Sequence, residues 1–304
     1  MARLEFIEND IGMIERNDTL YLDVKFRDDG SNVDPTGVTV DIEYPCSGSG
    51  NASFATTPVT GRWEGHWDVP SSATYGEYTI EYTAVYDGHN YKFRTKFYVL
   101  PWDMTQKIRS LTGIKQSNDI SDRDLAVIAW NAYLEAKEEV FNRVIDERVK
   151  QTCNHYFDGS NKTFYTRNRR VVSDYTTCEE SAVFGFYKDN DGDLNDLSVT
   201  VSDAANGLVS IEDESGNAIP ASQCGVYINY RIHTSSFTDS LFEKAVSYLA
   251  AHEVILKFHE LDKATLADLD SNRPVILANP NRMEEKYKKT LAKIKFKQFG
   301  GLHL

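Results

Sequence analysis

The chain has 304 residues and a formal net charge of −13, and 41% of its residues are hydrophobic. This length suggests about two domains, and the composition is that of a folded, soluble protein. The acidic excess argues against a protein that wraps nucleic acid with most of its surface. No apolar run is long enough to cross a bilayer and no apolar leader is visible, so we expect no membrane association.

Residues 1–101 have the two-residue alternation of β-strands. The pattern predicts an antiparallel sandwich with strands at 19–26, 38–45, 61–70, 76–88 and 90–101, and a Gly/Ser loop at 46–54. Asp87-Gly88 is a hairpin signal. Tyr78 stands where an immunoglobulin-like domain has its tyrosine corner, although the disulfide pair of antibody domains is absent.

Aromatic residues are frequent in this first segment, and they include Trp63 and Trp67. Packing between the two sheets is the interpretation that their alternation with apolar neighbours favours. A platform on which a sugar ring stacks is the alternative, and it names the Trp63/Trp67 pair as the contact.

Residues 103–113 predict a short helix that ends at Gly113. Residues 121–150 then predict one long amphipathic helix, with Ser121 and Asp124 in a capping-box arrangement. Apolar or small side chains recur three or four residues apart along it, which marks one buried stripe. The stripe comprises Leu125, Ile128, Ala129, Ala132, Ala136, Val140, Val144 and Ile145.

An inserted β-segment is expected at about 157–232, because the hydrophobic period returns to two. The predicted strands are 163–167, 169–175, 181–188, 196–201, 207–213 and 224–232. A return helix should begin near Thr238 or Asp239. After a polar link, Asn281 is expected to cap a last helix, with Glu284 in the capping-box position.

The charge is uneven along the chain. Residues 273–304 hold eight Lys/Arg and two Glu, a net charge of +6, which leaves −19 for the remainder. The last helix has an apolar stripe at Met283, Tyr287, Leu291 and Ile294, but little core of its own. We therefore interpret 273–304 as a basic arm that docks on a partner.

Asp189, Asp191, Asp193 and Asp196 have the spacing of a calcium loop. Leu194 occupies the position of the EF-hand glycine, however, so a solvated acidic turn is the alternative. No nucleophile elbow, phosphate-binding loop or dinucleotide fingerprint occurs. We expect no enzymatic activity, and no cofactor other than calcium at this turn.

The four cysteines match no zinc-binding pattern. Free thiols in a reducing compartment are the favoured interpretation. One disulfide between two of Cys153, Cys178 and Cys224 stays open.

Residues 104–270 resemble the head–tail connector (adaptor) proteins of tailed viruses. The likeness lies in a short helix before a capped long helix, a middle β-segment containing SVTVSDAANGLVSI and CGVYINYRI, and a return helix with Ala250-Ala251-His252. The expected fold is α+β and multidomain. It consists of an immunoglobulin-like sandwich (1–101), a helical adaptor domain with its β-insertion (102–272) and a C-terminal helical arm (273–304).

The resemblance implies a structural virion protein. Adaptors of this kind form a ring, usually of about twelve copies. The ring joins the portal to the next neck or tail-completion protein and extends the channel through which genomic DNA passes. Such a protein is made in the host cytoplasm and is located in the virion neck. The alternative function is a surface immunoglobulin-like module that binds a glycan or a host receptor.

The resemblance also assigns portal docking to the C-terminal arm. The residues expected to carry it are Met283, Tyr287, Lys288, Lys289, Leu291, Ile294 and Lys295.

Overall fold

The computed structural model describes residues 4–114, 120–151, 157–175, 177, 183–188, 193–220, 225–265 and 279–295. The chain divides into two compact units. Unit 1 comprises residues 1–133, 177–179 and 246–285, and unit 2 comprises residues 134–176, 180–245 and 286–304.

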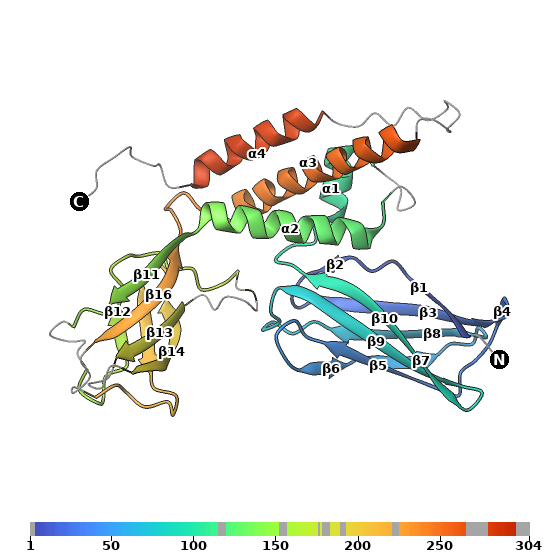
Figure 1. Ribbon diagram of the computed structural model, residues 1–304, viewed down its shortest axis with the longest axis horizontal. Helices are drawn as coiled ribbons and strands as arrows, with labels where there is room; N and C mark the ends of the chain where they lie inside the picture. The colour runs from blue at the N-terminus through green and yellow to red at the C-terminus, as the bar shows by residue number, and fades with distance from the viewer. Residues whose placement is uncertain are drawn as a thin grey trace. The chain divides into compact units, whose positions relative to one another are not determined.

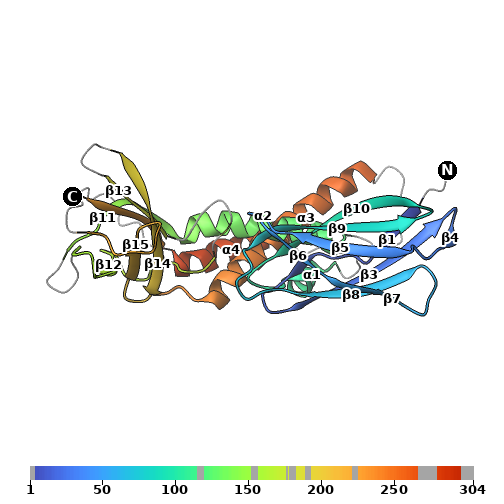
Figure 2. The same ribbon diagram turned by 90° about the horizontal axis from the view of Figure 1, so that it is seen from below.

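Unit 1 contains a β-sandwich (Figures 1 and 2). One sheet has the order β1 (Leu4–Glu8), β3 (Thr19–Asp28), β8 (Arg62–Asp68) and β7 (Ser53–Thr56), and β4 (Ser31–Asn32) pairs with β3. The other has the order β2 (Met13–Ile14), β10 (His89–Val99), β9 (Gly76–Tyr86), β5 (Gly37–Glu43) and β6 (Ser49–Asn51). All pairs are antiparallel except β2 with β10.

The predicted sandwich is thus confirmed, and its sequence pattern explains it. Leu22, Val24 and Phe26 alternate inward along β3 and are almost completely buried. The Tyr78 hydroxyl donates a hydrogen bond to the Thr74 carbonyl at 2.9 Å, as a tyrosine corner does. Strands β1, β2, β4, β6 and β7 were not predicted, and β6 and β7 occupy most of the expected Gly/Ser loop.

The β9–β10 hairpin follows its turn signal. Asp87 and Gly88 have φ angles of 49° and 70°, the left-handed values that a two-residue type I′ turn needs. Tyr86 then pairs with His89 directly across the turn, so the register of the long hairpin starts there.

Helix α1 (Thr105–Thr112) ends at Gly113, whose φ of 83° is left-handed, as predicted. Helix α2 (Asp122–Val140) has the expected cap. The Asp124 amide donates to Ser121 Oγ at 3.0 Å, and that hydroxyl donates to the Asp124 carboxylate at 2.9 Å. These local signals were sufficient to place the end of α1 and the start of α2.

The expectation that α2 continues to residue 150 is wrong. The helix ends at Val140, and Asn142–Arg148 is strand β11, which pairs with β16 (Val226–Ile232). Ile145, assigned to the buried stripe, is 68% exposed. Val144 and Ile145 are β-branched and favour a strand once a partner strand is present, so tertiary pairing overrode the helical period.

Contacts within unit 1 attach the start of α2 to the sandwich. The Asp10 carboxylate accepts hydrogen bonds from the amides of Asp122 (2.5 Å) and Arg123 (3.3 Å), which are unsatisfied donors of the first helical turn. At Gly12 the backbone approaches so closely that a Cβ would lie 2.3 Å from the Asp122 carbonyl oxygen. The start of α2 is therefore held against the sandwich by hydrogen bonds and by close backbone packing.

Unit 2 contains a six-stranded sheet with the order β11, β16, β13 (Val183–Lys188), β14 (Leu194–Asp203), β15 (Leu208–Glu212) and β12 (Thr163–Tyr165). Buried apolar side chains of these strands form its core, including Phe164, Val209, Ile211 and Ile228. After β12 the chain returns to β11, where the Arg167 amide donates a hydrogen bond to the Glu147 carboxylate at 2.5 Å. Because β11 pairs with β16 in this sheet, the β-insertion starts at β11, before the expected residue 157. The segment 169–175, expected to be a strand, contributes only one bridge, at Val171.

Two further helices complete the described chain. Helix α3 (Asp239–Thr265) begins where expected, after Thr238. Helix α4 (Pro280–Ile294) is capped by Asn279, whose side-chain oxygen accepts the Asn281 amide at 3.0 Å. The cap expected at Asn281 is thus two residues too late, because proline is favoured in the first helical position and its predecessor then caps.

Cys46 forms a disulfide, which corrects the expectation of four free thiols. The other three cysteines lie outside the described residues. Sequence spacing does not reveal this bond, because folding, not distance along the chain, brings two thiols together.

Candidate functional site: helix α4 and its basic face

Helix α4 is the element to which the sequence assigned a docking role. Its apolar side chains recur at Met283, Tyr287, Leu291 and Ile294, and all four are at most 5% exposed. In unit 1, Met283 packs in a cluster with Ala251 and Ile255 of α3. The stripe is therefore already covered by the chain itself.

In unit 2, Glu139 of α2 holds the middle and end of α4. It accepts a hydrogen bond from the Tyr287 hydroxyl at 3.3 Å and forms an ion pair with Lys295. The Thr234 hydroxyl donates to the Ile294 carbonyl at 2.8 Å, which satisfies an acceptor of the last turn. Burial raises the pKa of Tyr287 well above its usual value, and the charge of Glu135 adds to that effect.

These contacts show that residues 280–295, which the sequence suggests are part of a basic arm that docks on a partner, pack against helices of their own chain. Four of the seven predicted docking residues are buried in this chain, and Lys295 is ion-paired. The apolar stripe found a partner within the chain, because burying it there removes apolar surface from water without the entropy lost on association. Lys288 and Lys289 are exposed, as a docking role needs.

The exposed side of α4 is strongly basic. Arg282, Lys289 and Lys293 are spaced by seven and four residues and therefore share one face, and Lys288 lies beside it. We call these four residues the basic face; all four are exposed. Such a surface suits an acidic partner, and its attraction is electrostatic and sensitive to salt.

The sandwich segment has the opposite balance of charge. Residues 1–101 hold sixteen Asp/Glu against eight Lys/Arg, a net charge of −8. One chain therefore carries both an acidic segment and a basic helix face. Such a chain can pair electrostatically with another copy of itself as well as with an acidic protein.

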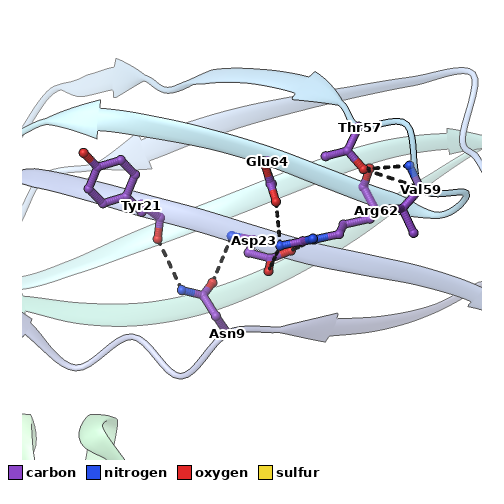
Figure 3. A network of polar contacts seen from close by, with 7 residues as sticks. All are labelled: Asn9, Tyr21, Asp23, Thr57, Val59, Arg62 and Glu64. Carbon is purple, nitrogen blue, oxygen red and sulfur yellow. Dashed lines mark hydrogen bonds and ion pairs between the residues drawn. The ribbon is translucent and has the colours of Figure 1, made fainter.

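The outer face of the β1–β3–β8–β7 sheet carries a polar network (Figure 3). Arg62 donates to both carboxylate oxygens of Asp23, at 3.0 and 2.9 Å, and pairs with Glu64 at 2.6 Å. Asn9 bridges the backbone of Tyr21 and Asp23. One guanidinium between two carboxylates leaves a single net negative charge, so the network pairs side chains on the sheet surface and offers no concentrated charge to a ligand.

The glycan platform expected at Trp63 and Trp67 is not present. These side chains are only 7% and 6% exposed and belong to the sandwich core. Trp67 contacts Tyr78 and Phe97 at ring distances of 5.8 and 6.0 Å. A sugar ring cannot stack on either indole in this fold, because inward strand positions place both between the sheets.

The calcium hypothesis falls partly outside the described residues. Asp189 and Asp191 lie there, whereas Asp193 precedes β14 and Asp196 pairs with Phe186 of β13. Among the residues that the structure describes, no group of three or more His, Cys, Asp or Glu could hold a metal ion. Calcium binding at 189–196 therefore stays a prediction.

No helix within the described ranges combines the length and apolar character that a membrane crossing requires.

The sequence matches no protein-family model and no curated protein. Its structure is similar to the Lin-41 filamin domain, with 17% identity and a TM-score of 0.24 over 33% of this chain and 93% of that domain. It is similar to the titin M3 domain, with 12% identity and a TM-score of 0.21 over 32% of this chain and 98% of that domain.

A third similarity is to a DUF4785 family protein from Legionella pneumophila. It has 14% identity and a TM-score of 0.26 over 32% of this chain, which spans 27% of that protein. Similarities of this size carry no argument about function.

Proposed function

We propose that this chain is a structural virion protein, a head–tail adaptor that assembles as a ring between the portal and the next neck or tail protein. The order of elements supports the proposal. A glycine-ended α1, a capped α2, a β-segment and a return helix α3 follow one another as in the adaptor proteins that the sequence resembles. We propose localisation in the virion neck and no enzymatic activity.

The observation that carries the proposal furthest is the basic face of α4 in a chain whose remainder is acidic. A ring needs a heterologous interface, in which one face of each subunit meets a different face of the next. Oppositely charged surfaces on one chain meet that need, and they also suit docking on an acidic portal surface. An acidic lining would let DNA slide through the ring, because it repels phosphates.

The test is mass photometry of the chain mixed with the portal protein of the same source. Deleting 273–304 would expose the surface that Met283 and Tyr287 cover, so charge reversal is the cleaner perturbation. The variant combines Lys288→Glu, Lys289→Glu and Lys293→Glu. A matched control with the same change in net charge combines Lys25→Glu, Lys150→Glu and Lys188→Glu, all exposed and outside α4.

We expect a ring-sized complex with the wild-type chain and with the control, and its loss with the α4 variant. A ring that survives the α4 variant would keep the adaptor role and move the docking surface elsewhere. Absence of any complex with the portal, for wild type as well, would contradict the proposed function.

A further inference from the structure

Unit 2 contains a pocket of about 230 Å³ that the adaptor role does not use. Phe141, Tyr175 and Phe237 form its aromatic wall, and His233, Asp174 and Asp239 add polar groups. All of these residues belong to one unit, and the segments that carry them are far apart in the sequence. Pockets for drug-sized ligands are usually about 300–1,000 Å³, so this pocket has the size of a side chain.

The aromatic wall is continuous. The ring centroids of Phe141 and Tyr175 are 5.6 Å apart, those of Phe141 and Phe237 are 5.3 Å apart, and His233 lies 4.7 Å from Phe237. Phe141 is buried, whereas Tyr175 and Phe237 are only partly covered. The partly covered rings leave aromatic surface for a group that enters the pocket.

Tyr175 is held in its place against backbone preference. Its φ of 64° lies in the left-handed region, where a bulky side chain is a genuine outlier. The Tyr175 amide donates to the Asp174 carboxylate at 2.7 Å, and its hydroxyl donates to Asp239. The two acidic residues therefore position the ring that they flank.

The pocket is also electrostatically one-sided. Two carboxylates line it, and none of the described residues that line it is Lys or Arg. The His233 Nδ1 is 2.9 Å from the Thr234 carbonyl; that bond requires a proton on Nδ1 and leaves Nε2 as an acceptor in the neutral ring. Aromatic faces, carboxylates and an imidazole acceptor all favour a cation.

We propose that this pocket binds the guanidinium group of an arginine side chain presented by a partner protein. A guanidinium is planar, stacks on aromatic rings and donates in pairs to carboxylates, so it uses both the wall and the acids. A bare metal ion would use only the acids, and the aromatic wall would add nothing to its coordination. The inference rests on the pocket alone and is independent of the proposed virion role.

The test titrates the full chain with two peptides, acetyl-Gly-Arg-Gly-amide and acetyl-Gly-citrulline-Gly-amide, and follows the aromatic proton signals by NMR. Citrulline has nearly the same shape as arginine but no charge. We expect saturable shifts of the Tyr175, Phe237 and His233 ring signals with the arginine peptide. The citrulline peptide should bind at least about tenfold more weakly.

Asp239→Asn should weaken binding of the arginine peptide about tenfold, because it removes one carboxylate and keeps its shape. Asp174→Asn is a second variant, which decides the outcome if a change in the first turn of α3 impairs folding. Glu214→Gln, an exposed acid of the same unit outside the pocket, should bind like wild type. Equal affinity for the two peptides, or no saturation up to about 20 mM arginine peptide, would overturn the proposal.

Discussion

The Tyr287 hydroxyl donates a hydrogen bond to the Glu139 carboxylate at 3.3 Å, and this contact fastens α4 to α2 within unit 2. The ring itself is buried, with 5% of its surface exposed. One side chain of α4 thus supplies both apolar area and a polar contact. Substitution of Tyr287 therefore tests directly whether α4 is packed against α2.

Tyr287→Ala should lower the free energy of unfolding by about 3 kcal/mol, because a large buried ring is replaced by a cavity. Tyr287→Phe keeps the ring and should lower it by only about 1 kcal/mol, the usual contribution of one hydrogen bond. Urea denaturation measures both. If the alanine variant were as stable as wild type, α4 would not be packed against α2 in solution.

Gly12→Ala should destabilise the chain and weaken the attachment of α2 to the sandwich. A Cβ at this position would lie 2.3 Å from the Asp122 carbonyl oxygen, which belongs to backbone and cannot rotate away. Gly37→Ala is the matched control, since a Cβ there meets nothing within 4 Å. Thermal denaturation should show a clearly lower Tm for the first variant and almost no change for the second.

Glu8 predicts a pH dependence of stability. Burial raises the pKa of Glu8 above its ordinary value of 4.5, although contacts with Thr95, Tyr82 and Arg123 oppose the shift. A carboxyl with a raised folded-state pKa favours folding fully below the unfolded pKa, and that contribution is lost as pH rises through the folded pKa. Glu8→Gln does not titrate.

Unfolding free energies of wild type and Glu8→Gln, measured by urea denaturation from pH 4 upward, should therefore diverge. The stability of wild type relative to the variant should fall as pH rises through and above 4.5. A difference that stays constant, or that moves in favour of wild type, would show that the contact with Arg123 outweighs burial.

The Cys46 disulfide predicts sensitivity to reduction. Cys46→Ser should lower the free energy of unfolding by about 2–4 kcal/mol, and a reducing agent should lower the stability of wild type but not of the variant. Peptide mapping without reduction should find Cys46 joined to another cysteine. Finding only free Cys46 thiol after purification under oxidising conditions would contradict the bond.

Local signals in the sequence were enough for much of the fold. Alternation along β3, β9 and β10, the Asp87-Gly88 turn, the Ser121 cap and Gly113 act within a few residues. The structure that each signal predicts from sequence is therefore the structure found in the folded chain. The tyrosine corner at Tyr78 is equally local, because its hydroxyl reaches a carbonyl only four residues away.

The tertiary structure decided what depends on distant partners. Val144 and Ile145 match a helical stripe, but the chain around them becomes strand β11, in which Val144 pairs with Tyr230 of β16. The stripe of α4 looks unpartnered in sequence, and its partners, such as Ala251 and Glu139, come from two other helices. Phe141, Tyr175 and Phe237 show no common motif, because only folding joins the three segments that carry them. A sequence pattern states which surface must be buried, but packing free energy chooses what buries it.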